Sequence, residues 1–315
     1  MGLFPIGFYN KTQSNTMKKN DLQLMTCKAG YSVVYNSREN AQITDAQLHN
    51  LQKNWGKVDY KGTLSKQTSR RIAHILQVWA RTLYVNQYKN NPLGVKKNRN
   101  LVFVTLTLSK KQTHDDLEIK RLLLNNFLIY ANRKFGMQNY LWKAEKQKNG
   151  SLHFHIITDV YINKHELNYQ WDCIQHSHGY FNSKPCFVPK YESPSTRVEA
   201  VHSGEGVYAY MAKYVAKGDE NGKVKGRVWG CSKSVRELED YTFTVDSELL
   251  YNVELLLRSQ KVEMRVHDYC IIFTRDLFFN LYHMCQYHRQ KINMIYASNY
   301  HRLYSNSDEF ELATI

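Results

Sequence analysis

The chain has 315 residues, a hydrophobic content of 43% and a formal net charge of +15. This is enough for one large domain, or for one domain of about 150–180 residues with flanking structure. No apolar run reaches the roughly 18 residues of a membrane-spanning helix, so we expect no membrane partner. The first residues lack the regions of a signal peptide and the six cysteines form no Cys-x-x-Cys pair, so we expect a reduced, cytoplasmic protein.

The positive charge is combined with 23 tyrosines, 13 phenylalanines and 5 tryptophans. Cationic side chains pair with phosphates, and aromatic rings stack on unpaired bases. The composition therefore favours a nucleic acid as partner. The alternative is a basic protein whose charge only keeps it soluble.

The predicted elements alternate between strands and helices after a polar beginning. Residues 1–60 are expected to form an accessory extension, with a hairpin or edge strand at 31–35, and 65–88 form a helix. Strands follow at 101–108, 139–146, 152–160 and 197–202, with helices at 113–134 and 164–177 between them and a last helix at 207–217. This order, β-α-β-β-α-β-α, predicts an α+β fold with a ferredoxin-like or RRM-like antiparallel sheet.

Local signals refine these boundaries. Thr113 is the expected N-cap of the helix at 113–134, and Gly136 is its expected stop. Asn149-Gly150 predicts a hairpin between the second and third strands. The buried stripe of the same helix is expected to consist of Leu117, Leu124, Leu128 and Ala131.

The end of the chain is expected to differ from its middle. An edge strand is predicted at 226–233, and residues 246–300 are mostly helical with one strand at 269–274. We therefore expect three regions: an extension at 1–60, a catalytic domain at 61–240 and a mostly helical region at 241–315.

Two histidines stand two residues apart in the third strand. At that spacing a strand points His153 and His155 to the same side. Glu145 precedes the hairpin turn and should lie beside one of them. A carboxylate with two imidazoles, and with positions left open, suits a hard divalent ion. The alternative is a set of polar residues on a half-exposed strand.

A second group of possible metal ligands is less regular. Cys173, His176, His178 and Cys186 are residue types that bind zinc, but their spacing is not that of known zinc motifs. We expect no structural zinc there.

The helix at 207–217 carries one phrase twice, Tyr210-Met-Ala-Lys213 and Tyr214-Val-Ala-Lys217. Residues four apart are neighbours on a helix. A free tyrosine has a pKa of about 10, so roughly one in a thousand is ionised at neutral pH. Nearby lysine charge favours the phenolate and thus nucleophilic attack. The alternative is an amphipathic helix whose tyrosines pack on the sheet.

Together these segments resemble the HUH endonuclease superfamily, and within it the two-tyrosine rolling-circle replication initiators of microviruses and related small phages and plasmids. Three motifs correspond in order: the strand at 103–108, His153-Phe-His155, and the tyrosine–lysine segment at 207–217. The segment 227–232 is similar to one found downstream in phage members. The resemblance covers residues 65–235.

The resemblance implies metal-dependent transesterification of DNA. Mg²⁺ or Mn²⁺ would be held by His153, His155 and Glu145. Tyr210 or Tyr214 would attack the scissile phosphate, which forms a 5′-phosphotyrosine link and frees a 3′-hydroxyl.

The resemblance also implies roles for Lys213 and Lys217, which would position phosphates or favour the phenolates. The expected substrate is single-stranded or hairpin origin DNA in the cytoplasm of a bacterial host, and a host polymerase would extend the free end. The sequence has no Gly-x-x-x-x-Gly-Lys-Ser/Thr loop, so we expect a separate helicase.

Three other functions remain open. A single-strand transposase would share the chemistry but usually carries a cysteine-rich zinc module. A plasmid relaxase usually places its tyrosine ahead of the histidine motif. A non-catalytic RRM-like binding protein would bind nucleic acid without metal or covalent product.

Overall fold

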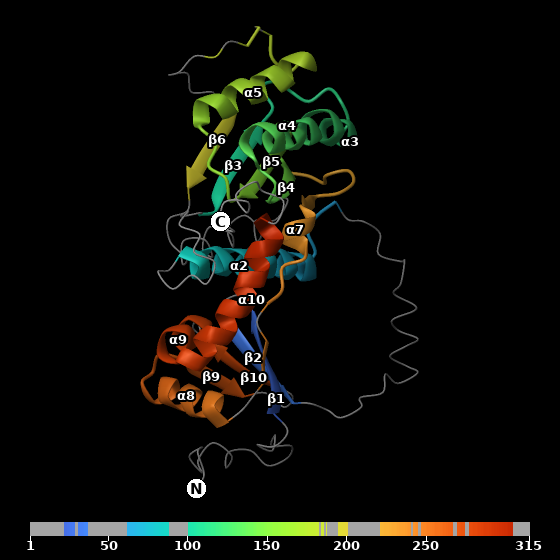
Figure 1. Cartoon of the computed structure of the whole chain (residues 1–315). Coiled ribbons are helices and arrows are strands. Elements are labelled where there is room, and N and C mark those ends of the chain that lie inside the picture. The colour runs from blue at the N-terminus through green and yellow to red at the C-terminus, as the bar shows by residue number, and fades with distance from the viewer. Residues whose placement is uncertain are drawn as a thin grey trace, which may run out of the picture. The chain divides into compact units, whose positions relative to one another are not determined.

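The computed structural model describes residues 22–28, 31–36, 62–87, 100–182, 184, 185, 187, 195–200, 221–240, 242–244, 247–266, 270–274 and 277–304 (Figure 1). The chain forms two compact units. One consists of Met1–Asp59 with Glu239–Ser298, and the other of Tyr60–Leu238 with Asn299–Ile315.

The larger unit is built on a five-stranded antiparallel sheet with the order β6-β3-β5-β4-β7. Its strands are β3 (Val102–Thr107), β4 (Tyr140–Lys146), β5 (Leu152–Thr158), β6 (Thr196–Ala200) and β7 (Trp229–Cys231). Helices connect β3 to β4 and β5 to β6, and β4 and β5 form a hairpin. This is the split β-α-β-β-α-β arrangement, which confirms the predicted α+β fold.

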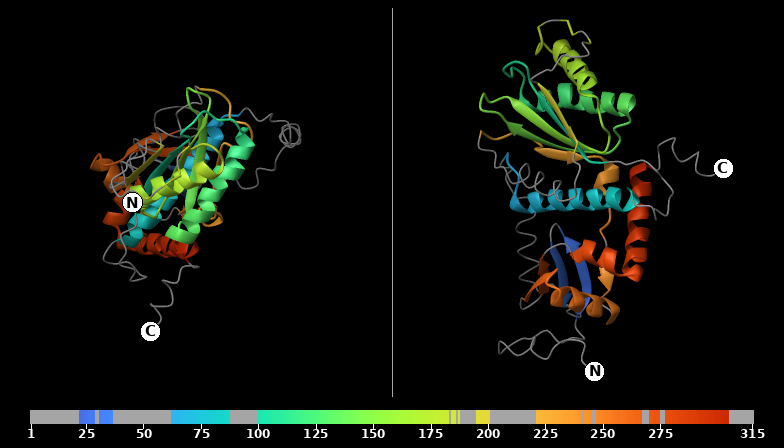
Figure 2. Two further views of the ribbon diagram at one scale, coloured as in Figure 1. Left: turned by 90° about the horizontal axis from the view of Figure 1, so that it is seen from above. Right: turned by 90° about the vertical axis from the view of Figure 1, so that its left-hand side faces the viewer.

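Helices from the two crossovers cover one face of this sheet, as the right-hand view of Figure 2 shows. They are α3 (Asp116–Ile119), the π-helical turn η3 (Lys120–Leu124), α4 (Asn125–Phe135) and α5 (Lys164–Ser177). Leu123, Phe127 and Trp171 are fully buried against Val104, Phe154 and other apolar residues of the strands.

The opposite face of the sheet is divided into an apolar and a polar half. Helix α2 (Lys66–Gln87) and the last residues of α10 (Gln286–Tyr304) pack on Phe103, Leu141 and Ile157. Side chains of a strand alternate between faces, so the next residues on this same face lie two positions further along. There the strands carry polar side chains instead, namely Thr105, Thr107, Lys143, Glu145, His153 and His155.

The first crossover helix begins two residues later than predicted. Its N-cap is Asp115, not Thr113. The Asp115 carboxylate accepts hydrogen bonds from two backbone N–H groups of the first turn, and the Asp115 N–H donates to the Glu118 carboxylate. The hydroxyl of Thr113 lies 3.1 Å from the Tyr180 hydroxyl instead. A carboxylate with a matching Glu three residues on forms the stronger cap.

One residue of the predicted buried stripe of that helix is not buried. Leu124, Leu128 and Ala131 are buried, whereas Leu117 is 47% exposed. Leu117 is followed by the π-helical turn η3, which ends at Leu124 and has more residues per turn than an α-helix. Positions before it are therefore rotated away from the face that α-helical spacing predicts.

Two glycines stand where the backbone needs a positive φ. Gly136 ends α4 with a φ of 68°, and Gly150 forms the β4–β5 turn with a φ of 81°, as predicted. The Asn149 side chain accepts a hydrogen bond from the Ser151 N–H at 2.9 Å, which closes the turn.

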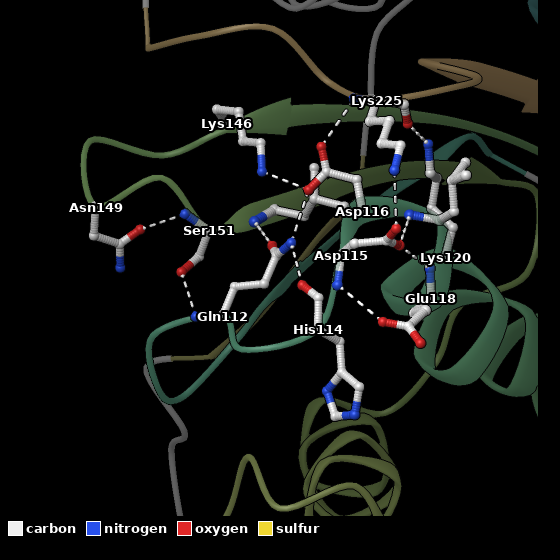
Figure 3. A network of polar contacts seen from close by, with 12 residues as sticks. Gln112, His114, Asp115, Asp116, Glu118, Lys120, Lys146, Asn149, Ser151 and Lys225 are labelled. Carbon is white, nitrogen blue, oxygen red and sulfur yellow. Dashed lines mark hydrogen bonds and ion pairs between the residues drawn. The ribbon is translucent and has the colours of Figure 1, made fainter.

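A buried carboxylate joins three separate segments near this hairpin (Figure 3). Asp116 is 7% exposed and accepts hydrogen bonds from Lys146 Nζ at 2.5 Å, Gln112 Nε2 at 2.7 Å and the Lys225 N–H at 2.8 Å. Burial by itself raises the pKa of Asp116, but these donors bring the pKa below its usual value. We call Asp116, Gln112, Lys146 and Lys225 the Asp116 cluster.

The chain after residue 220 is attached to the same place by further bonds. Lys120 Nζ donates to the carbonyls of Lys225 and Arg227, at 2.5 and 2.9 Å. Asn221 Nδ2 donates to the Lys146 carbonyl at 3.1 Å. Residues 221–228 are thus fixed beside the end of β4.

The smaller unit contains its own antiparallel sheet, with the order β8-β1-β2-β10-β9. Its strands are β1 (Leu22–Lys28), β2 (Tyr31–Asn36), β8 (Thr242–Thr244), β9 (Glu263–Val266) and β10 (Cys270–Thr274), and its helices are α8 (Ser247–Arg258), α9 (Leu277–Met284) and the first part of α10.

Strands from before residue 60 and after residue 240 thus share one sheet, a pairing that the sequence did not reveal. The predicted hairpin at 31–35 exists, but β2 lies inside the sheet between β1 and β10 rather than at its edge. In the described residues no helix has the length and apolar character needed to cross a membrane.

Candidate metal centre

The histidine motif lies on the polar half of the β3–β5–β4 face because of the register of these strands. Residues that are opposite in antiparallel strands point to the same face. The register produces two rows across the sheet: Thr107, His153 and Glu145 in one, and Thr105, His155 and Lys143 in the next. The predicted placement of Glu145 beside a histidine is therefore correct.

The three candidate ligands are close enough to share one ion. One ligand atom from each of Glu145, His153 and His155 lies within 4.8 Å of the others. His155 Nε2 lies 2.9 Å from Glu145 Oε1, and the two imidazole rings are 4.5 Å apart, centre to centre, at 77° to each other. We call these three residues the triad.

The surroundings of Glu145 keep its carboxylate ionised. Burial by itself raises the pKa of Glu145, but the hydrogen bond with His155 and the charges of His155, Lys143 and His153 lower it to about 2. Lys143 Nζ lies 3.6 Å from Glu145 Oε2. The carboxylate therefore has no proton to lose before it can bind a cation.

The triad fits a divalent metal ion by the chemistry of its donors. Two imidazoles and one carboxylate supply nitrogen and oxygen ligands, and all three side chains are partly rather than fully buried. Three protein ligands leave coordination positions for water or phosphate oxygens.

The other predicted site residues are not described by the structure. Tyr210, Lys213, Tyr214 and Lys217 lie in the stretch 201–220, outside the described residues, so their roles stay predictions. The described chain resumes at Asn221, which is bonded to the neighbour of Glu145 in β4.

Neighbours of the triad on β3 were missed by the sequence analysis. Thr107 Oγ1 lies 2.8 Å from His153 Nδ1, and Thr105 Oγ1 lies 3.4 Å from His155 Nδ1. The available signal was the alternation of threonine with valine and leucine along this strand. Polar residues at every second position indicate a face that is not part of the core.

The expectation that residues 173–186 hold no structural zinc stays a prediction. Cys186 lies outside the described residues, and Cys173 is a free thiol whose pKa is raised by burial. Among the described residues, the triad is the group of three or more such ligands that the fold brings together.

Comparison with known proteins yields one match. No curated protein and no solved structure matches the chain. Residues 101–219 match the family model of replication-associated protein ORF2/G2P. The matched stretch contains β3, the β4–β5 hairpin and the tyrosine–lysine segment, so the candidate metal centre lies in the part of the chain that is similar to replication-associated proteins.

Proposed function

We propose that this chain initiates rolling-circle replication by nicking and rejoining single-stranded origin DNA. The observation that carries the proposal is the triad, an ion-binding arrangement within a stretch that is similar to replication-associated proteins. The excess of 43 basic over 28 acidic residues favours a DNA partner.

The triad would bind the ion and bring the scissile phosphate to the polar half of the sheet. His153, His155 and Glu145 would hold Mg²⁺ or Mn²⁺, which when bound polarises a phosphate oxygen and offsets developing negative charge. Lys143, next to Glu145, adds positive charge on the same face.

The nucleophile in this proposal is the phenolic oxygen of Tyr210 or Tyr214. The phenol would lose its proton as its oxygen bonds to phosphorus and the bond from phosphorus to the 3′ oxygen breaks, and the 3′ oxygen would take up one proton and leave as a 3′-hydroxyl. One phosphodiester is replaced by one phosphotyrosine ester, so rejoining needs no ATP. The second tyrosine would cut the new origin while the first still holds the old end.

The remaining roles in the proposal belong to lysines and to partners. Lys213 and Lys217 would contact phosphates or favour the phenolates. The DNA would be single-stranded or extruded as a hairpin. A separate helicase would separate the strands, and a host polymerase would extend the 3′-hydroxyl.

The test is covalent capture of DNA. Purified protein with Mn²⁺ and a single-stranded origin oligonucleotide should yield an adduct that survives denaturation. Tyr210→Phe combined with Tyr214→Phe should abolish the adduct, as should His153→Ala. Tyr161→Phe is the matched control, because Tyr161 is 64% exposed in the same unit and should leave the adduct unchanged.

Two results would contradict the proposal. An adduct that persists in the double phenylalanine variant would show that another residue is the nucleophile. DNA binding that is weakened by salt but indifferent to EDTA, with no adduct from the wild-type protein, would favour the non-catalytic RRM-like function instead.

A further inference from the structure

We propose that Thr107 is a positioning residue of the metal centre, which holds His153 in the orientation and tautomer that bind the ion. This inference rests on the metal ion of the proposed function. It assigns a role in metal binding to β3, which otherwise serves as an inner strand of the sheet.

The contact between the two side chains is short and follows from the register. Thr107 and His153 are directly opposite in the β3–β5 ladder, and Thr107 Oγ1 lies 2.8 Å from His153 Nδ1. This is a normal hydrogen-bond distance. Gln147 Nε2 lies farther from the same nitrogen, at 3.5 Å. Because two side chains lie at Nδ1, Nε2 is the nitrogen of His153 that would bind an ion in this inference.

The backbone of Thr107 is fixed on both sides. Its N–H donates to the Ser195 carbonyl at 2.7 Å, and its carbonyl accepts from Trp171 Nε1 at 2.7 Å. Trp171 is fully buried in the core beneath the other face of the sheet. The packed core therefore fixes the position of the Thr107 hydroxyl, and the contact with this hydroxyl fixes the orientation of the His153 ring.

The direction of the hydrogen bond decides whether His153 can bind a metal. If His153 Nδ1 donates its hydrogen to Thr107 Oγ1, Nε2 carries the lone pair that can bind an ion. If the hydroxyl donates instead, neutral imidazole carries its hydrogen on Nε2 and cannot bind there. A threonine oxygen can accept as well as donate, and partners of this kind fix the tautomer of metal-binding histidines.

Thr105 provides a comparison within the same strand. It faces His155 as Thr107 faces His153, but its Oγ1 lies 3.4 Å from His155 Nδ1, at the limit of a hydrogen bond. His155 is also oriented by Glu145, whose Oε1 is 2.9 Å from Nε2. We therefore expect Thr105 to contribute less to metal binding than Thr107.

The experiment measures Mn²⁺ affinity without DNA, by electron paramagnetic resonance or calorimetric titration. Thr107→Val keeps the shape of the side chain and removes the hydroxyl, and should weaken Mn²⁺ binding by about tenfold. Thr107→Ser keeps the hydroxyl and should restore affinity to near the wild-type value. Thr105→Val, the same change two residues away, should weaken binding by less than about threefold.

A second measurement uses the wild-type protein and does not depend on how the variants fold. With Zn²⁺ as a diamagnetic probe and ¹⁵N-labelled histidine, long-range ¹H–¹⁵N spectra should show the hydrogen of His153 on Nδ1. A hydrogen on Nε2 would overturn the inference.

The outcomes separate this inference from the proposed function. If the wild-type protein binds no Mn²⁺, the metal centre fails and the role of Thr107 fails with it. If the wild type binds Mn²⁺ and Thr107→Val binds it equally well, only the role of Thr107 is overturned. Equal weakening by Thr105→Val and Thr107→Val would overturn it as well, because the effect would not follow the shorter contact.

Discussion

Two ionised carboxylates near the β4–β5 hairpin have opposite surroundings. Asp116 is bonded to an ammonium group, a side-chain amide and a backbone N–H, all of which can only donate here. Glu145 lies against the imidazole of His155, and a second imidazole, that of His153, is close by. Both carboxyls have pKa values below the usual value.

The comparison shows that partner chemistry, rather than charge or burial, separates a structural carboxylate from a metal ligand. The oxygens of Asp116 are occupied by donors, so a cation would have to displace them. The closest partner of Glu145 is the imidazole of His155, at 2.9 Å, whose nitrogen becomes an acceptor when it loses its hydrogen. The Lys143 ammonium is farther away, at 3.6 Å. The triad can thus turn three lone pairs toward one ion, and the Asp116 cluster cannot.

The largest expected effect comes from removing the charge of the metal-facing carboxylate. Glu145→Gln should lower the rate of adduct formation by at least about a thousandfold, because a bound ion supplies several kcal/mol of transition-state stabilisation. The midpoint of thermal unfolding should change little, since Glu145 is only partly buried. Adduct assays and melting curves measure both. A variant with a much lower unfolding midpoint but a normal rate of adduct formation would contradict the comparison.

The opposite pattern is expected for the structural carboxylate. Asp116→Ala should lower the free energy of unfolding by about 3 kcal/mol, because it leaves the Lys146 ammonium and two other donors buried without their acceptor. Urea unfolding measures the loss. Mn²⁺ affinity should stay within about threefold of wild type.

A second substitution tests the cause of that loss. Lys146→Met removes the ammonium, so Asp116→Ala in this background should cost less than it does in the wild type. If the two losses simply add, the ion pair between Lys146 and Asp116 is not what makes Asp116 important.

Much of the sheet unit could be predicted from the sequence because its signals are local. Helix α5 was predicted at 164–177 and lies at Lys164–Ser177, where the Asn163 side chain caps its first turn. The exposure of Leu117 could not be predicted. It depends on the π-helical turn η3, and the choice between π and α hydrogen bonding is made by packing rather than by spacing.

The triad could also be predicted from local signals in the sequence. The spacing of His153 and His155 and the hairpin turn were sufficient to bring Glu145 to the histidines. The contact of Thr107 with His153 joins residues 46 positions apart. It depends on the register between β3 and β5, which the whole core sets and no local signal reveals.

A third carboxylate extends the comparison, because it is buried with few donors. Asp172 is 4% exposed, and within the described part of the chain it accepts two long hydrogen bonds, both at 3.4 Å, from Ser195 Oγ and Gln175 Nε2. Burial raises its pKa to about 6, despite these donors. Between about pH 4 and pH 6 the folded protein therefore holds a proton on Asp172 that the unfolded chain has lost.

Stability should consequently fall as the pH rises through this window. The contribution of protonated Asp172 is fully present below the unfolded pKa and is lost above about pH 6, a change of up to about 3 kcal/mol. Asp172→Asn stays neutral, so its advantage over wild type should grow from pH 4 to pH 7 in urea unfolding. An advantage that is constant with pH would mean that the Asp172 carboxyl titrates normally.

The smallest expected effect distinguishes Asp115 from its neighbour Asp116. Asp115 caps the first turn of α3 from the surface, where its carboxylate accepts from the N–H groups of Leu117 and Glu118 at 2.9 and 2.8 Å. Asp115→Ala should lower the unfolding midpoint by about 2–4 °C, the effect of losing one cap in a domain of this size. Asp115→Asn keeps an acceptor and should lose less.

Thr113→Ala is the control for this assignment, because the sequence favoured Thr113 as the cap and the structure favours Asp115. It should shift the midpoint by less than Asp115→Ala does. A larger shift for Thr113→Ala would return the cap to Thr113. The loss of stability should be smaller for Asp115→Ala than for Asp116→Ala, because Asp115 is exposed and water can replace its partners. Equal losses would mean that an exposed carboxylate contributes as much to stability as a buried one surrounded by donors.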